Sequence, residues 1–432
     1  MAKEEKDETR EAGREVRGVW TREVIREIKQ KAETGKHSIR GCGTTRKLPH
    51  FDDLVIMASQ LSRMSIDTYR EDCKTRTVLG KRVAKEPLVV ETPILISGMS
   101  YGALSKEAKT ALAKATSIVG TSINNGEGGL LPEERANSYK EVVQIVPSRI
   151  GFSLRNIEAA DALEIICGIG AKPGLAGHLM KEKITEEIAK FRQLPPGIDL
   201  HSHPRHGDIY GADDLMLKIE ELREITEERI PIFIKIAAGR VNEDVKIAAK
   251  AGVDGIVVDG MEGGTGAAPL VALNHLGIPT LPALVQAVRA LEEMGVKDQV
   301  SLIVSGGIRD GADAAKSLAL GADAVAIGTG AMVAMGCTVC LQCHKGLCPH
   351  GIGTQREDLR ARLDIEEAAI RVANYIKAMT YELVILTKAA GKTDVHSLER
   401  EDVRALTLEA SLTTGIPLVG TNFVFGDRFG YI

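Results

Sequence analysis

The chain has 432 residues, of which 44% are hydrophobic and 26% charged, and its formal net charge is −4 at pH 7. This composition predicts a globular protein with a large core, and the slightly acidic balance argues against nucleic acid as a partner. The sequence has no apolar run long enough to cross a membrane, and its charged N-terminus does not resemble a secretory signal. We therefore expect a cytoplasmic protein without membrane or nucleic-acid partners, whose thiols stay reduced.

The two ends of the chain differ from its middle in their pattern of charged and apolar residues. Residues 1–18 carry mixed charge without an apolar period, which predicts a disordered tail. Residues 19–90 are expected to form a helical N-terminal extension that packs on the main domain, with helices near 20–31 and 51–61. Residues 386–432 are expected to form a C-terminal helical extension.

Between residues 91 and 385, short apolar runs alternate with helical patterns. The predicted strands are Ile94–Gly98, Gly120–Ile123, Ile150–Ser153, Leu163–Cys167, Ile232–Ile236, Gly255–Asp259, Leu302–Ser305 and Ala324–Ile327. The predicted helices between them include Lys106–Ile118, Asp213–Ile225, Val241–Ala251, Pro282–Met294 and Gly311–Leu320. This alternation favours an α/β fold, a (β/α)8 TIM barrel, although an open doubly wound sheet has the same alternation.

Glycine-rich segments follow most of the predicted strands, at the barrel end where active sites form. These segments are 97–103, 124–129, 168–174, 260–267, 305–308 and 328–330. The last two, with Gly306, Gly307, Gly328 and Gly330, suit a phosphate-binding turn before a helix. Beside a redox centre such a turn suggests flavin mononucleotide (FMN), and a phosphorylated sugar substrate is the alternative.

Charged side chains in two places suggest contacts with a ligand. Lys235 is the one charge in a strongly apolar strand, where it could hold the anionic edge of a reduced flavin or pair with Glu164 or Asp259. The segment 201–208 contains three histidines and Asp208. It could bind a metal, contact a substrate from a loop, or lie on the surface.

Four of the seven cysteines fall within twelve residues, at Cys337, Cys340, Cys343 and Cys348, while the others are scattered. Thiolates this close together can wrap one soft metal centre, and Pro349 after the last of them is common in iron–sulfur loops. The cluster loop is expected over 336–355, directly after the last strand. Zinc, or free or disulfide-forming thiols, are the alternatives.

Several motifs together resemble a known family. They are Gly98-Met-Ser-Tyr-Gly-Ala-Leu-Ser105, Asn125-Gly-Glu-Gly-Gly129, Gly170-Ala-Lys-Pro-Gly174, His206-Gly-Asp-Ile-Tyr210, Gly263-Gly-Thr-Gly-Ala267, Ser305-Gly-Gly307 and Cys337-x5-Cys343-x4-Cys348-Pro. Their order resembles the FMN domain of the glutamate synthase large subunit, over about residues 45–385. The remaining C-terminal stretch is similar to short stand-alone relatives, among them the large subunit of N-methylglutamate synthase.

This resemblance implies FMN in the barrel, a 3Fe–4S cluster on the cysteine loop, and reductive amination of 2-oxoglutarate. It implies Cys337, Cys343 and Cys348 as cluster ligands, with Cys340 either free or a fourth ligand of a 4Fe–4S cluster. The flavin-binding positions that it implies are Gly98, Met99, Ser100, Asn125, Glu164, Lys235, Gly263, Gly264, Gly306, Gly307, Gly328, Thr329 and Gly330. Lys235, Arg149 and Lys172 are the candidate catalytic residues, the last two as substrate anchors or as structural ion pairs.

The sequence also departs from the large synthases. It starts Met1-Ala2 where they have a cysteine nucleophile, and it has no recognisable amidotransferase domain or ferredoxin-type insert. Ile236 follows Lys235 where they have a glutamate, which leaves the substrate open. We expect an oligomer with a glutaminase or amidotransferase subunit that supplies ammonia, and a ferredoxin-like or NAD(P)H-oxidising subunit that donates electrons.

Three other functions remain open from the sequence. Methylamine could replace ammonia, the barrel could oxidise a 2-hydroxy acid, or the chain could be a non-catalytic subunit for electron transfer or assembly.

Overall fold

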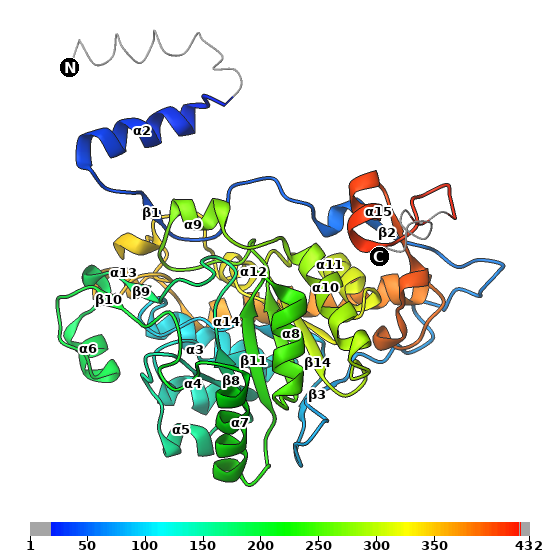
Figure 1. Ribbon diagram of the computed structural model, residues 1–432, viewed down its shortest axis with the longest axis horizontal. Helices are drawn as coiled ribbons and strands as arrows, with labels where there is room; N and C mark the ends of the chain where they lie inside the picture. The colour runs from blue at the N-terminus through cyan, green and yellow to red at the C-terminus, as the bar shows by residue number, and fades with distance from the viewer. Residues whose placement is uncertain (1–18, 423, 425–432) are drawn as a thin grey trace.

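A closed barrel of eight parallel strands forms the centre of the computed structural model, which describes residues 19–422 and 424 (Figure 1). In chain order the strands are β5 (Ile94–Ile96), β6 (Ser122–Asn124), β7 (Lys140–Ile145), β8 (Ala162–Ile166), β11 (Ile232–Ala237), β12 (Gly255–Asp259), β14 (Ser301–Ser305) and β15 (Ala324–Ile327). Each strand pairs in parallel with the next, and β15 pairs with β5. The (β/α)8 barrel is confirmed and the open sheet is excluded.

The third strand was predicted in the wrong place. The sequence suggested Ile150–Ser153, but the strand is β7, and residues 150–153 form a turn that leads into α5 (Leu154–Glu158). β7 begins with Lys140 and Glu141, and Glu141 is fully buried. These charged residues hid the strand, because a barrel strand is expected to be a continuous apolar run.

The predicted helices around the barrel are confirmed to within about three residues. They are α3 (Lys106–Val119), α7 (Ala212–Thr226), α8 (Val241–Lys250), α10 (Thr280–Glu293) and α11 (Gly311–Ala319). The longest helix, α14 (Ile365–Ala389), packs against α3 and α11 and so completes the helical ring. The cysteine loop is therefore part of the long connection between β15 and this last helix of the ring.

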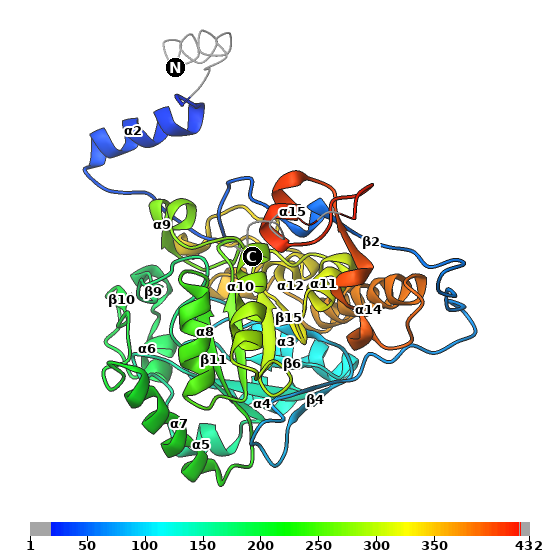
Figure 2. The ribbon, with the colours of Figure 1, turned by 45° about the vertical axis from the view of Figure 1, so that its right-hand side comes forward.

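The N-terminal extension contains less helix than predicted. Helix α2 (Arg22–Thr34) is present and stands away from the barrel in both views (Figures 1 and 2). The prediction of a second helix near 51–61 is wrong, because Phe51–Asp53 forms one 3-10 turn that is followed by β2 (Leu54–Ile56). Phe51 and Leu54 are both buried, and their spacing imitates a helix, but Val55 and Ile56 are β-branched and continue as strand.

Strand β2 joins the N-terminal extension to the far end of the chain, because it pairs antiparallel with β16 (Val403–Ala405). The predicted C-terminal helical extension accordingly mixes this strand with one helix, α15 (Leu408–Thr414). The predicted tail, residues 1–18, lies outside the described residues. Within the described residues no helix combines the length and the apolar character needed to cross a membrane.

A hairpin from the N-terminal extension closes the end of the barrel where the strands begin. Strands β3 (Thr77–Leu79) and β4 (Leu88–Val90) pair antiparallel, and Leu79 and Leu88 are buried. They pack in one apolar cluster with barrel residues that include Phe233 and Val257. The opposite end, where the strands terminate, is left for the site.

Candidate functional site

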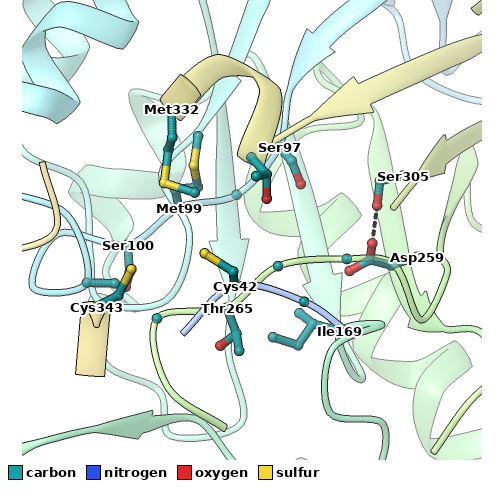
Figure 3. Close-up of a pocket in the computed structure, with 18 of the residues that line it drawn as sticks. Cys42, Ser97, Met99, Ser100, Ile169, Asp259, Thr265, Ser305, Met332 and Cys343 are labelled. Atoms are coloured by element: carbon teal, nitrogen blue, oxygen red, sulfur yellow. Dashed lines mark hydrogen bonds between the residues drawn. The ribbon is translucent and has the colours of Figure 1, made fainter. Parts of the chain in front are cut away.

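A cavity of about 1200 Å³ lies at the carboxyl ends of the barrel strands (Figure 3). It is lined by most of the residues singled out in the sequence: Gly98, Met99, Ser100, Lys172, Lys235, Gly263, Gly264, Gly306, Gly307, Gly328, Thr329, Gly330, Cys337, Cys343 and Cys348. Four candidates do not line it: Asn125, Arg149, Glu164 and Cys340. Motifs separated by more than two hundred residues in the chain thus face one space.

Lys235 is one of the buried cations of this cavity. Its ammonium nitrogen lies 3.4 Å from a carboxylate oxygen of Asp259 and donates to the Ser97 hydroxyl at 3.3 Å. Burial alone disfavours the charged form, but the carboxylates of Asp259 and Glu164 outweigh it and raise the pKa of Lys235. The raised pKa favours the protonated form of Lys235, and both pairing partners suggested by the sequence act on it.

Asp259 is held in place from two further directions. Its carboxylate accepts hydrogen bonds from the Ser305 hydroxyl at 2.5 Å and from the Gly170 amide at 2.9 Å. Figure 3 shows the first of these bonds at the edge of the cavity. Because its orientation is fixed, Asp259 also fixes the position of the Lys235 ammonium.

Glu164 and Asn125 lie next to the cavity wall. Glu164 accepts hydrogen bonds from the side-chain amides of Asn124 at 2.9 Å and Gln144 at 2.7 Å. The Asn125 side chain accepts a bond from the backbone amide of Gln144 at 2.8 Å. Gln144 itself lines the cavity, so these two candidates position it rather than face the space themselves.

The two candidate substrate anchors have different surroundings. Lys172 lines the cavity, is 5% exposed, and donates to the carbonyl of Ala267 at 3.1 Å. Arg149 lies outside the lining residues, where it forms an ion pair with Asp208 and stacks on the Phe152 ring at 5.3 Å. The structure thus places Lys172 at the site and gives Arg149 the structural ion pair that was its alternative.

The glycine turn after β14 needs its glycines. Gly306 and Gly307 have φ angles of 104° and 74°, which side-chain-bearing residues rarely adopt. A Cβ atom at Gly307 would lie 2.9 Å from the Cβ of Glu262. The backbone can therefore approach a ligand closely here, as a phosphate-binding turn requires.

The turn after β15 leads into the predicted helix, α12 (Thr329–Ala334). A Cβ atom at Gly330 would lie 2.6 Å from the Tyr375 hydroxyl, so this position also has no room for a side chain. With fewer than two turns, α12 has a weak dipole, and close backbone N–H groups matter more than helix charge.

Three loop cysteines face the cavity together. Cys337, Cys343 and Cys348 line it, whereas Cys340 is exposed and does not. The buried ammonium of Lys183 lies beside them, donating to the carbonyl of Cys343 at 3.4 Å. Thiols are soft metal ligands, and the Lys183 ammonium would offset the negative charge of the thiolates. This arrangement fits an iron–sulfur cluster.

Cys42, Glu262 and Arg309 are three of the cavity-lining residues that the sequence reasoning missed. Cys42, from the N-terminal extension, is buried and lies with the three loop cysteines, although its position in the sequence looks isolated. Glu262 has one buried carboxylate oxygen without a partner, while the other accepts from the Thr280 amide and hydroxyl at 2.9 and 2.7 Å. Arg309 pairs with Asp52. Glu262 and Arg309 lie within or beside the glycine motifs 260–267 and 305–308, and this position in the sequence could have identified them.

The histidines of segment 201–208 do not form one site. His206 is buried against the carbonyl of Ile166 at 2.8 Å. His201 instead stacks on His178, with ring centroids 4.2 Å apart, across the antiparallel pair of β9 (His178–Leu179) and β10 (Leu200–His201). The three histidines are therefore divided: His206 lies against the barrel wall, His201 in the β9–β10 pair, and His203 in the cavity lining.

Known proteins match both the sequence and the fold. The conserved region in glutamate synthase matches residues 45–393. A glutamate synthase large subunit-like protein of Rhizobium meliloti is 46% identical, covering 93% of this chain and 95% of its own. An archaeal glutamate synthase (NADPH) of Methanocaldococcus jannaschii is 40% identical, covering 90% of this chain and 82% of its own.

Solved structures match the barrel at low sequence identity. A mutant flavocytochrome b2 with pyruvate bound is 20% identical, with a TM-score of 0.53, covering 90% of this chain and 85% of that one. A mandelate oxidase mutant with an FMN adduct is 18% identical, with a TM-score of 0.51, covering 81% and 87%. These likenesses support the fold, whereas the sequence matches cover nearly the whole chain. The chain belongs to the glutamate synthase family and is an oxidoreductase.

Proposed function

We propose that this chain is the synthase subunit of an FMN-dependent enzyme that converts 2-oxoglutarate and ammonia into L-glutamate. The observation that carries the proposal is that Lys235, the glycine turns after β14 and β15, and three loop cysteines line one cavity. A buried cation, an anion-binding turn and a thiol cluster are the three parts that a flavin fed by an iron–sulfur cluster needs. The names of the matched relatives support the reaction.

The cavity residues fit a flavin nucleotide. In our proposal the backbone at Gly306 and Gly307 receives the phosphate, and Lys235 faces the ring edge that becomes negative on reduction. When bound, FMN would supply the hydride that turns the imine of 2-oxoglutarate into an amine. Asp259 and Ser97 hold the Lys235 ammonium in place, so the chain contributes a preorganised charge.

The substrate carboxylates need a cation in the same cavity. We assign one of them to Lys172, because it is buried and lines the cavity, and not to Arg149, which is engaged by Asp208 outside it. A charge-assisted contact of this kind orients the keto acid and lowers the entropy cost of reaching the reactive geometry.

Electrons and ammonia have to come from partners in this proposal. Cys337, Cys343 and Cys348 would hold the cluster that relays electrons from a ferredoxin-like or NAD(P)H-oxidising subunit. A glutaminase or amidotransferase subunit would supply ammonia, within an oligomeric assembly. Of the cavity-lining histidines in the described residues, His178 and His203 lie in the connection that follows β8, so a histidine base is available there. We nevertheless disfavour oxidation of a 2-hydroxy acid, because that reaction has no use for the three cysteines that line the same cavity.

Anaerobic reoxidation of the photoreduced enzyme tests the proposal. Reoxidation should be faster with 2-oxoglutarate and ammonium together than with either alone. Loss of a contact to a substrate carboxylate costs about 2 kcal/mol or more, so Lys172→Gln should slow the reaction at least about tenfold at subsaturating keto acid. Arg149→Gln is the matched control and should stay within about twofold of wild type.

The other outcomes separate the alternatives. Equal loss in both variants would return Arg149 to the substrate site. Methylamine acting better than ammonium would make the product N-methylglutamate. If no amine promotes reoxidation while a partner subunit binds tightly, the chain is an electron-transfer or assembly subunit and the proposed reaction is wrong.

A further inference from the structure

The N-terminal extension places a fourth cysteine beside the loop cysteines. The segment Gly41–Gly43 is anchored on two sides: the Gly41 amide donates to the carbonyl of Leu341 at 3.2 Å, and the Cys42 amide donates to that of Thr265 at 2.8 Å. The bond from Thr265 back to Cys42, at 3.3 Å, completes a pair. Cys42 is thus clamped between the cysteine loop and the loop after β12.

The backbone of this segment is pressed against Cys343. A Cβ atom at Gly41 would lie 2.7 Å from the Cβ and 3.0 Å from the sulfur of Cys343, so only glycine fits. Figure 3 shows the side chains of Cys42 and Cys343 in the same part of the cavity. Among the described cysteines, Cys42, Cys337, Cys343 and Cys348 all line this space, together with Cys167 at the end of β8.

The conformation of Cys42 is costly in itself. Its φ angle is 64°, in the left-handed region, where a residue with a side chain loses about 1 kcal/mol or more. The side chain is only 4% exposed. A strained backbone that directs a buried thiol toward other thiols is the kind of outlier that marks a ligand position.

Cys340, the candidate fourth ligand from the sequence, has the opposite environment. It is exposed and absent from the cavity lining. Its neighbours Val339 and Leu341 both have positive φ angles, of 52° and 62°, so the loop makes a tight turn around it. Cys340 is therefore turned toward solvent, whereas the other three loop cysteines line the cavity.

We propose that Cys42 is the fourth thiolate ligand of the cluster, which would make it a 4Fe–4S centre. The inference rests on the proposed function for the cluster itself. Three loop cysteines can hold three irons, and a fourth iron requires one more soft ligand at the open corner. Each cysteine binds as the thiolate and gives up its proton on metal binding, so no oxidant or reductant is needed for ligation.

Wild type, Cys42→Ser, Cys340→Ser and Cys343→Ser, each purified anaerobically, test the assignment without any activity measurement. The readouts are iron per FMN and the EPR spectrum before and after dithionite reduction. Wild type and Cys340→Ser should hold about four irons, be EPR-silent when oxidised and show a signal when reduced. Cys42→Ser should hold about three irons and show its signal in the oxidised state.

The contrary outcomes are distinct. A wild type with about three irons and an oxidised-state signal overturns the inference and leaves the proposed function intact. Conversion by Cys340→Ser instead of Cys42→Ser assigns the ligand to Cys340. If wild type contains no iron, and Cys42 and Cys343 do not react in a thiol titration, the two cysteines form a disulfide. That result refutes both the cluster and the inference. Cys343→Ser should lose the iron whichever residue is fourth.

Discussion

At the scale of single residues, Lys172 shows how burial sets a working pH. Burial lowers the pKa of Lys172 to about 8, against an opposing effect of Glu127. A dicarboxylate binds to the protonated ammonium, so the binding energy is present below this pKa and is lost as the pH rises through it. A lysine on the protein surface would keep its charge at a far higher pH.

We therefore expect the affinity for 2-oxoglutarate to fall above about pH 8, up to about tenfold for one further pH unit. The measurement is the dissociation constant of the oxidised holoenzyme by calorimetry, across pH and without amine. Lys172→Arg, which keeps its charge, should flatten the profile. A wild-type profile that is already flat would show that Lys172 does not meet the substrate.

Single residues also mark the limit of sequence reasoning at the site. Lys235 stood out because its strand is otherwise apolar, and the structure places it in the cavity. Cys42 could not be identified, because only the fold brings its segment to the cysteine loop. Arg149 was a plausible anchor by its charge, and its pairing with Asp208 is a tertiary contact that no local pattern encodes.

At the scale of elements, the glycine turns after β14 and β15 are the parts whose backbone carries the proposed function. The φ of 74° at Gly307 and the close Cβ of Glu262 leave no low-energy place for a side chain. Such a turn could be predicted from the sequence, because glycines that follow the last two barrel strands are typical of phosphate-binding turns. The strand β7 was not, because its buried Glu141 contradicts the apolar pattern.

Gly307→Val should release FMN while the barrel remains folded, because the new side chain enters the phosphate turn and collides with Glu262. Flavin absorbance per protein and far-UV circular dichroism measure the two effects. Gly211→Val is the control, since its backbone is extended and a Cβ there meets nothing within 4 Å. Full flavin occupancy in the Gly307 variant would place the phosphate elsewhere.

At the scale of the whole molecule, the barrel could be predicted because strands and helices alternate with a regular period. The hairpin that closes the amino-terminal end of the barrel could not be predicted. The β3–β4 hairpin closes that end through Leu79 and Leu88, packed in one cluster with Phe233. Its short strands carry no signal of what they cover. The extension before the barrel is therefore part of the core of the domain.

Leu88→Ala should lower the free energy of unfolding by about 2 to 5 kcal/mol, since it leaves a cavity under a closed core. Val83→Ala, between the two strands and 39% exposed, should change it by less than about 1 kcal/mol. Urea denaturation measures both, and flavin content should be unchanged in each. Equal effects would mean that the hairpin is not part of the core.

The position of the cysteine loop has a consequence for how the protein matures. The loop lies between β15 and α14, and the Cys42 segment lies outside every barrel strand, so the metal ligands that we propose belong to connections and not to the barrel wall. The barrel core is closed by apolar packing that needs no iron. A cell short of iron would then accumulate a folded precursor, ready for cluster insertion once the metal supply recovers.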